Sequence, residues 1–174
     1  MTNPRISMRI WFLSVAFLAL PVLAGTVSAQ PTPQHEKLSY WNGSWKVESE
    51  IKPSPSFAGG KLAGTESCES FSNLHAVCKS ELTGPTGLYR TTRLISYVPA
   101  LKQYAQYTID SLGYASLAMG SLQGSTWTFT TDLAGTKIRN VMKTSGGSYT
   151  STSEYAGADG KWVTTATSKA SCAK

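Results

Sequence analysis

Apolar and polar residues alternate with a period of two along most of the chain from about residue 45 onward. In the first such run, Trp45, Val47 and Ile51 alternate with charged residues, and Pro53 then ends the run. Residues two apart lie on the same face of a strand, whereas a helix repeats its apolar positions about every 3.6 residues. The pattern therefore predicts short strands, each with one apolar and one polar face.

Nine further runs of the same kind follow, and turn-forming residues separate them. The runs cover residues 62–70, 75–83, 88–98, 101–110, 114–122, 125–132, 135–144, 147–156 and 161–170. Gly84-Pro85, Gly113 and Gly146-Gly147 are among the turn formers between them. About ten short strands joined by short turns predict an all-β fold, either an antiparallel sandwich or an up-and-down barrel.

The apolar residues of the later runs share one face of each predicted strand, and we expect these faces to line a common interior. The residues assigned to this interior, and hence to the wall of a barrel lumen, are Tyr107, Ile109, Leu117, Met119, Trp127, Phe129, Ile138 and Met142. The residues assigned to the outer face are Thr128, Thr130, Lys137, Arg139, Thr150, Thr152 and Glu154. Closing such a sheet removes its exposed edges, and a barrel of about ten strands can enclose more space than its own side chains fill.

The first 29 residues have the pattern of a secretory signal peptide. Arg5 and Arg9 precede an almost wholly apolar run over residues 10–24, and Val27-Ser28-Ala29 supplies the small residues that a signal peptidase reads. A retained membrane anchor is the alternative, but the apolar run has about 15 residues and a bilayer core needs roughly 20. We therefore expect cleavage before Gln30, export to the periplasm or the extracellular space, and no stable membrane anchor afterwards.

Three parts follow from these patterns. They are a signal peptide over residues 1–29, a linker with a short helical turn over residues 30–42, and a β-barrel domain over residues 43–174. The helical turn is expected between His35 and Tyr40. A chain of 174 residues is long enough to bury the core of one domain.

Composition and charge exclude several classes of protein. Charged residues make up 15% of the chain and apolar residues 41%, which excludes a coiled coil and a disordered, self-repelling chain. The 16 Lys and Arg residues exceed the 10 Asp and Glu residues, but they are scattered along the chain. Because they form no basic stripe, we expect no nucleic-acid partner. Composition leaves the oligomeric state open.

The chain has three cysteines, Cys68, Cys78 and Cys172, and an exported protein keeps paired cysteines oxidised. The segment between the first two resembles two strands around a turn near Asn73, which places residues 68 and 78 opposite each other. Opposed Cβ atoms lie roughly 4.5–5.5 Å apart, so a modest approach suffices for a disulfide. We expect a Cys68–Cys78 disulfide, which leaves Cys172 without a cysteine partner. A metal site is the alternative, but only His75 lies nearby as a further ligand.

Gly43-Ser44-Trp45 opens the first strand directly after the predicted helical turn. This segment resembles the Gly-x-Trp start of lipocalins and other calycin barrels. In that family the Trp caps the closed end of the barrel, and a basic residue from the last strand packs across it. The resemblance implies that Trp45 caps the closed end of the barrel and that Lys169 packs across it.

About residues 40–170 are similar to a family of exported, uncharacterised bacterial proteins, domain of unknown function 1579. The matching pieces are Trp41–Trp45, Cys68–Phe71 with Val77–Glu81, and Tyr97–Tyr104 continuing into Ile109–Gly113. The family usually carries Asp where this chain has Val98. The resemblance implies a calycin-like barrel and brings no activity with it.

The sequence lacks the motifs that carry catalysis. His35 and His75 are its two histidines, and we expect both to be exposed turn residues. It contains no Gly-x-Ser-x-Gly elbow and no His-x-His or His-Glu-x-x-His pattern. Glu48 and Glu50 share the solvent-facing side of the first strand, and Asp110 is expected to cap a turn. We therefore expect no catalytic residue, no cofactor and no metal, and a protein that is not an enzyme.

The sequence favours an exported, antiparallel, calycin-like barrel that binds a small hydrophobic or amphipathic ligand in its lumen. One alternative is an envelope interaction or stability module with a filled core and no ligand. Another is an enzyme of unknown type. An interior cavity with an opening favours the first function, and a solid interior with an exposed aromatic patch favours the second. Polar side chains converging inside the cavity, especially with His75 or Asp110, favour the third.

Overall fold

The computed structural model describes residues 30–54 and 58–173. Two short helices come first, α1 (Pro33–Glu36) and the 3₁₀ helix η1 (Lys37–Trp41). Ten strands follow, β1 (Gly43–Ile51), β2 (Gly60–Phe71), β3 (His75–Gly84), β4 (Gly87–Val98), β5 (Gln103–Asp110), β6 (Ala115–Gln123), β7 (Thr126–Leu133), β8 (Thr136–Ser145), β9 (Ser148–Ala156) and β10 (Trp162–Cys172). The predicted signal peptide over residues 1–29 lies outside the described residues. Within the described residues, we find no helix with the length and apolar character that a membrane crossing requires.

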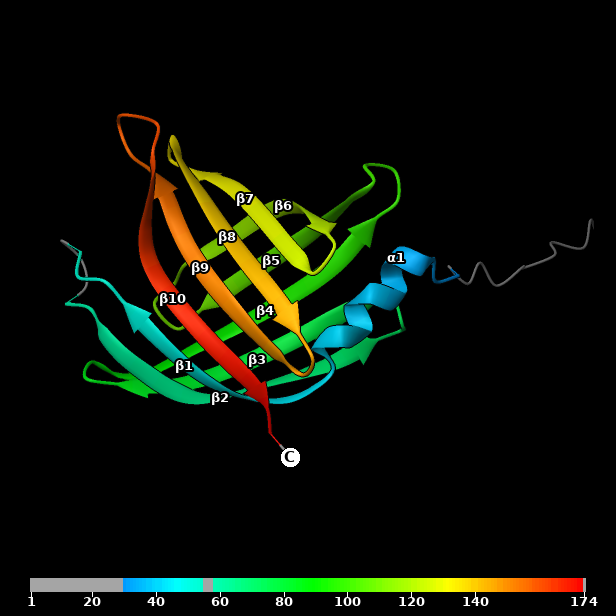
Figure 1. Ribbon diagram of the computed structural model, residues 1–174, viewed down its shortest axis with the longest axis horizontal. Helices are drawn as coiled ribbons and strands as arrows, with labels where there is room; N and C mark the ends of the chain where they lie inside the picture. The colour runs from blue at the N-terminus through cyan, green and yellow to red at the C-terminus, as the bar shows by residue number, and fades with distance from the viewer. Residues whose placement is uncertain (1–29, 55–57, 174) are drawn as a thin grey trace, which may run out of the picture. The chain divides into compact units, whose positions relative to one another are not determined.

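The ten strands form a closed antiparallel barrel in which each strand pairs with its neighbours in the chain (Figure 1). The ring closes where β1 pairs with β10, with Trp45 opposite Cys172 and Ile51 opposite Ala166. This confirms the predicted all-β, up-and-down barrel and excludes the sandwich. The predicted runs agree with the observed strands to within two residues at each end, because the turn-forming residues between the runs do form the turns.

The turns adopt the backbone geometry that their residues favour. Ser72 and Asn73 have φ values of 54° and 56° in the turn between β2 and β3. Gly146 and Gly147, with φ values of 48° and 82°, form the two-residue turn between β8 and β9. Positive φ at both central positions is the geometry that matches the twist of a hairpin, and glycine adopts it without strain.

The helices α1 and η1 lie at one end of the barrel, which we call the closed end (Figure 1). Pro33 begins α1, where its fixed φ suits a helix start, and Leu38 and Trp41 of η1 are buried. The Tyr104 hydroxyl donates to the Gln34 carbonyl oxygen at 3.0 Å and so ties β5 to this end. The opposite end, where β1 finishes at Ile51 and the β5–β6 turn follows Asp110, is called the mouth.

Cys68 and Cys78 form a disulfide between β2 and β3, as the sequence predicts. The two residues are direct partners in the strand pairing, and both are buried. Cys172, at the end of β10, is unpaired and exposed.

Reducing the Cys68–Cys78 disulfide is expected to lower the free energy of unfolding by about 2–3 kcal/mol, since a short loop loses its constraint in the unfolded chain. Urea unfolding with and without a reductant measures this difference. A Cys172→Ser background prevents thiol exchange in both samples. An unchanged unfolding midpoint after complete reduction would contradict the expectation.

Alternation along β7 and β8 matches the predicted faces. Trp127, Phe129 and Met142 are at most 2% exposed and point into the barrel, whereas Arg139 lies on the outer face and pairs with Glu154 of β9 at 2.6 Å. Ile138 is half-buried and has the same parity on β8 as Met142. The predicted inward residues of β7 and β8 therefore face the interior, where polar Asn140 of β8 joins them.

On β5 and β6 the predicted faces are wrong. Tyr107, Ile109 and Leu117 are 46%, 43% and 57% exposed, and Met119 shares the outer parity of Leu117. The inward positions of these strands are Tyr104, Gln106, Thr108, Ala118 and Gly120. Apolar and polar residues do alternate along β5 and β6, but the inward positions hold mainly polar and small residues. The more hydrophobic face of each strand therefore points outward, opposite to the prediction.

The reversal on β5 and β6 produces an apolar ladder on the outer surface. Leu94 of β4 lies opposite Tyr107, and Tyr107 lies opposite Leu117. Directly opposed side chains on one face of a sheet contact one another, which partly shields these three from water.

Candidate functional site: the barrel lumen

The interior of the barrel contains a cavity of about 260 Å³, which we call the lumen cavity. Its lining mixes aliphatic side chains with hydroxyl, amide and ionic groups. The lining residues are Val47, Ser49, Ile51, Leu62, Glu66, Ser80, Leu82, Tyr89, Thr91, Arg93, Gln106, Thr108, Asn140, Met142, Tyr149, Ser151, Ser153, Ala166 and Ser168. They come from β1 to β5 and from β8 to β10, on both sides of the seam where the ring closes, so the cavity depends on the closed barrel.

Aromatic side chains fill the closed end beneath the lumen cavity. Trp127 packs against Tyr104 with ring centroids 4.8 Å apart and against Trp41 at 5.7 Å. Tyr149 packs edge-on against both Trp41 and Trp45 at 5.4 Å. The Trp45 ring nitrogen donates to the Trp41 carbonyl oxygen at 2.9 Å, which fixes η1 against β1. Edge-on packing of this kind gives the cavity a rigid floor.

A buried ion pair stands between this floor and the cavity. Nη2 of Arg93 on β4 donates to both carboxylate oxygens of Glu66 on β2, at 2.7 and 2.6 Å. The Tyr149 hydroxyl donates to the same carboxylate at 2.9 Å. The guanidinium also lies over the Trp41 ring, 5.6 Å from its centroid. The side chains of Glu66 and Arg93 are only 4% and 13% exposed, so water screens their attraction weakly.

The protonation states within this cluster follow from burial and from charge. Burial of the guanidinium lowers the pKa of Arg93, but attraction by the Glu66 carboxylate more than offsets this, and the pKa ends above its ordinary value. Burial raises the pKa of Tyr149, and the Glu66 charge raises it further against the lowering effect of Arg93. Arg93 therefore stays charged, and Tyr149 stays a neutral donor.

The wall above the ion pair carries uncharged polar groups. Gln106 is 9% exposed, and its Nε2 donates to the Thr108 hydroxyl at 3.2 Å. Its Oε1 has no hydrogen-bond partner. Across the ring, Nδ2 of Asn140 donates to the hydroxyls of Ser151 and Ser153 at 3.2 and 2.9 Å. The wall therefore offers a largely neutral hydrogen-bonding surface.

A second cavity of about 480 Å³ lies at the mouth and is mostly apolar. It shares Ile51, Leu62 and Tyr89 with the lumen cavity. Its lining also includes Leu112 and Tyr114, which are 61% and 60% exposed. Together the two cavities run from a polar base to an apolar rim.

Asp110 organises one side of the mouth. Its Oδ1 accepts hydrogen bonds from the backbone nitrogens of Leu112 and Tyr114 at 2.9 and 3.0 Å, which confirms the predicted turn-capping role. Its Oδ2 accepts a hydrogen bond from the Tyr89 hydroxyl at 3.0 Å. Burial and the Asp110 carboxylate raise the pKa of Tyr89, so this hydroxyl remains protonated.

The predicted wall residues divide into two groups. On the inner side, Met142 lines the lumen cavity, Trp127 and Phe129 are buried in the closed end beneath it, and half-buried Ile138 is not among the residues that line the cavity. Tyr107, Ile109, Leu117 and Met119 lie on the outer surface and contribute nothing to the lumen. The cavity is instead lined by residues that hydrophobicity did not single out.

The predicted roles at the barrel end are half correct. Trp45 is 1% exposed and belongs to the closed end, as expected. Lys169 is exposed and faces outward opposite Glu48, because β10 turns its even-numbered residues inward beyond an irregularity between Thr164 and Ala166. The basic group that packs on a closed-end tryptophan is that of Arg93, from β4 rather than from the last strand.

The two histidines lie at the closed end, outside the lumen cavity. His35 is 7% exposed and His75 is half-buried at the start of β3, so the expectation of two exposed turn residues is wrong for both. Nδ1 of His35 accepts a hydrogen bond from the Thr32 backbone nitrogen at 3.0 Å, and the His35 ring packs edge-on against Tyr97. His75 is bonded to the Ser96 hydroxyl at 2.7 Å. Partial burial, followed by the nearby His35, lowers the pKa of His75.

One cluster of metal-ligating atom types occurs among the described residues. Glu66, Cys68 and Cys78 place an oxygen and two sulfurs within 4.8 Å of one another. The two sulfurs are bonded to each other, and the carboxylate is held by Arg93. A divalent ion would need deprotonated thiolates here, so the oxidised cluster does not suit one.

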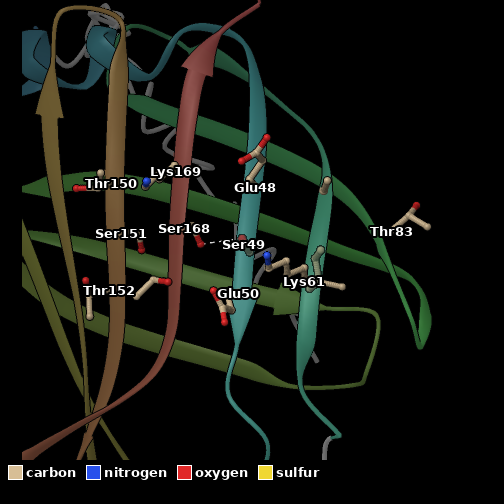
Figure 2. Close-up of a pocket in the computed structure, with 13 residues that line it drawn as sticks. Glu48, Ser49, Glu50, Lys61, Thr83, Thr150, Ser151, Thr152, Ser168 and Lys169 are labelled. Carbon is tan, nitrogen blue, oxygen red and sulfur yellow. Dashed lines mark hydrogen bonds between the residues drawn. The ribbon is translucent and has the colours of Figure 1, made fainter.

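A groove of about 680 Å³ follows the outer wall of β9, β10, β1 and β2 (Figure 2). Charges of opposite sign face each other across it, with Glu48 opposite Lys169 and Glu50 opposite Lys61. On the inner face of the same seam between β1 and β10, the hydroxyls of Ser49 and Ser168 meet at 2.8 Å (Figure 2). Such cross-strand pairs stabilise a sheet and do not converge on a single point. The groove is a charged outer surface, and the lumen is the stronger candidate site.

These features define a calycin-like, ten-stranded antiparallel barrel with an interior cavity beside an apolar mouth. The chain belongs to the family described as "Protein of unknown function (DUF1579)", whose model matches residues 30–171. Among solved structures, it is similar to that of Rv2717c from M. tuberculosis, with a TM-score of 0.63 and 9% identity. The match covers 83% of this chain and 100% of that chain, and at this identity it shows the fold alone. No curated protein matches the chain.

Sequence reasoning missed Glu66, Arg93 and Gln106. The positions of Glu66 and Arg93 relative to the two paired cysteines contained a signal for both residues. Glu66 lies two residues before Cys68 and so shares its face of β2, and Arg93 lies directly opposite Cys78. Once the disulfide is placed on the inner face of the sheet, both charged residues must point inward as well.

Proposed function

We propose that this protein binds a small amphipathic molecule in its lumen, with the polar end at the base and the apolar end at the mouth. The observation that carries this proposal is that the polar lumen cavity and the apolar mouth cavity are adjacent, with Ile51, Leu62 and Tyr89 lining both. Burying apolar ligand surface at the mouth contributes roughly 25 cal/mol per Å² before the costs of binding are subtracted.

The rigidity of the closed end supports a binding role. The Cys68–Cys78 disulfide, the packed tryptophans and the Glu66–Arg93 pair all hold the base of the lumen in one arrangement. A site that is already formed before the ligand arrives binds it without the entropy cost of ordering its own side chains.

We propose binding rather than catalysis, although polar side chains do converge in this lumen. The carboxylate within the cavity lining is that of Glu66, and it is held by Arg93 and Tyr149. Asp110, at the mouth, accepts from Tyr89 and from two backbone nitrogens. His75 lies outside this cavity lining. A general base must reach the proton that it takes from the substrate, and each of these two carboxylates already accepts three hydrogen bonds within the protein.

The alternative of a filled core receives less support than ligand binding. A lumen cavity of about 260 Å³ is larger than the small voids that remain between packed side chains. The apolar ladder of Leu94, Tyr107 and Leu117 on the outer surface is a feature that favours an interaction surface.

We also propose that the protein acts after export. The buried Cys68–Cys78 disulfide supports this, because such bonds persist in oxidising compartments and are rare in the cytosol. The apolar leader predicted over residues 1–29 points in the same direction.

Native mass spectrometry of the protein purified from its own host tests the binding proposal. We expect a bound species of a few hundred daltons that is released when the protein is denatured. Repeated recovery of bare protein, together with no change in tryptophan fluorescence on titration with medium-chain amphiphiles, would contradict the proposal. Trp41, Trp45 and Trp127 in the floor of the lumen make this fluorescence a direct reporter.

Ala166→Phe is expected to reduce the affinity for any lumen ligand by more than about tenfold, because a phenyl ring would occupy the cavity that Ala166 lines. Thr167→Phe is the matched control, since Thr167 is the adjacent, exposed residue on the outer face. Fluorescence titration compares the two variants with the parent protein. Equal losses in both variants, or none in either, would place the ligand outside the lumen.

A further inference from the structure

The outward residues of β4, β5 and β6 form an uncharged, largely apolar surface, which we call the β4–β6 outer face. The strand register aligns nine of them in three rows that cross these strands. The rows are Ser96 with Ala105 and Met119, Leu94 with Tyr107 and Leu117, and Thr92 with Ile109 and Ala115. All nine belong to the described part of the chain, and none of them carries a charge. Val77 of β3 extends the middle row, because it lies opposite Leu94.

The large side chains of this face are exposed although they are mostly apolar. Leu94, Tyr107, Ile109 and Leu117 are 37%, 46%, 43% and 57% exposed. A large side chain has roughly 200 Å² of accessible surface when fully exposed, so these four offer about 400 Å² and the whole face on the order of 600 Å². A contiguous patch of this size is at the upper end of what soluble monomers expose, and such patches mark interaction sites.

The outer wall on the other side of the ring has the opposite character. There, Glu48 lies opposite Lys169, and Glu50 lies opposite Lys61. Surfaces with interspersed charges of both signs are well hydrated and favour solubility. Apolar exposure is therefore not a general property of this outer wall, and the uncharged rows on β4, β5 and β6 need a separate explanation.

Charge and area both favour a second copy of this chain as the partner. The chain has a formal net charge of +6, so two copies repel each other unless they meet on surfaces without charge. The β4–β6 outer face meets that condition, and a two-fold contact would place its middle row against the same row of the other copy. Two such faces would bury about 1,200 Å² in total, which is the lower limit for a specific complex. Every strand of the closed ring already has two strand neighbours, so the contact is made by side chains and adds no strand.

We infer that the protein forms a two-fold homodimer through the β4–β6 outer face, with Tyr107 at its centre and Leu94 and Leu117 on either side. None of the nine residues lines the lumen cavity or the mouth cavity, so the dimer is independent of ligand binding. The modest area predicts a dissociation constant in the micromolar range.

Sedimentation velocity of the mature protein between about 1 and 300 µM tests the inference. A Cys172→Ser background excludes dimers joined by a disulfide through this exposed cysteine. We expect a monomer–dimer equilibrium that raising the NaCl concentration from about 50 to 500 mM does not weaken, because the face carries no charge to be screened. A protein that stays monomeric throughout, including one whose face binds lipid vesicles instead, would overturn the inference. So would a dimer that dissociates in high salt.

Leu117→Lys identifies the surface through which the dimer forms. The substitution places one positive charge per copy in the contact, and we expect dimerisation to weaken at least roughly 100-fold. Leu117→Ser removes apolar area without adding charge and should weaken it roughly tenfold.

Leu101→Lys is the matched control for Leu117→Lys. Leu101 is 59% exposed, close to the exposure of Leu117, but it lies in the turn between β4 and β5, outside the β4–β6 outer face. This variant should keep the dissociation constant of the parent, and circular dichroism verifies the fold of all three variants. A dimer that survives both Leu117 variants, or that Leu101→Lys weakens as much as Leu117→Lys, forms through another surface and would overturn the inference.

Discussion

Replacing Glu66 with Gln is expected to lower the free energy of unfolding by about 3–5 kcal/mol. The substitution keeps the size of the side chain but removes its charge, so Arg93 is left as a buried, unpaired cation with 13% exposure. Tyr149 also loses a charged acceptor for its hydroxyl. Urea unfolding followed by tryptophan fluorescence measures the change.

Glu81→Gln is the matched control for this experiment. Glu81 also pairs with an arginine, Arg90, at 2.7 Å, but the side chains are 59% and 61% exposed. Exposed pairs contribute less than about 1 kcal/mol, so this variant should unfold almost like the parent protein. The double variant Glu66→Leu with Arg93→Met removes both charges and should be more stable than Glu66→Gln. If Glu66→Gln and Glu81→Gln lose equal stability, the interior pair is not isolated from water.

Trp127→Ala is expected to cost about 3–5 kcal/mol of stability, because it leaves a large cavity in the closed end. Trp127 is 2% exposed and packs against Trp41, Tyr104 and Phe129, so no neighbour can collapse into the space without breaking its own contacts. Thermal and urea unfolding measure the loss.

Trp162→Ala provides the comparison for the same change of residue type. Trp162 is half-buried on β10 and stacks on the Arg139 guanidinium, with the cation 4.1 Å from the ring centroid. Losing such a contact costs about 1 kcal/mol or less. Similar losses at positions 127 and 162 would mean that the closed end is not the packed core of the barrel.

The fold could be predicted from the sequence because its signals are local. Glycine-rich turns such as Gly146-Gly147 and the period-two pattern between them set the number and the bounds of the strands. The disulfide followed from the same information, because the turn at Asn73 alone determines that Cys68 and Cys78 are opposed.

The site could not be predicted in the same way, because hydrophobicity alone does not determine which face of a strand points inward. Assigning the more hydrophobic face to the interior succeeded on β7, where Trp127 and Phe129 fill the interior. It failed on β5, where Gln106 and Thr108 face a cavity and Tyr107 and Ile109 face outward. A strand that lines a polar lumen has the same alternation as a strand that lines an apolar core, but with its faces exchanged.

The buried ion pair was also beyond the reach of local pattern. Glu66 and Arg93 lie 27 residues apart, and their meeting depends on the positions of β2 and β4 on either side of β3. A charged residue within a strand is ordinarily assigned to solvent, and only the register of the closed barrel brings these two together inside.

The seam between β1 and β10 also governs how this barrel can fold. Ser49 and Ser168 lie 119 residues apart in the chain, whereas the other strand pairings join strands that follow one another in the chain. The hairpins can form rapidly and independently, but joining the first strand to the last must overcome the entropy of a loop that spans almost the whole domain. Closure of the ring is thus the late, slow event, and one edge of β1 has no partner in a nascent chain until the final strand has been synthesised.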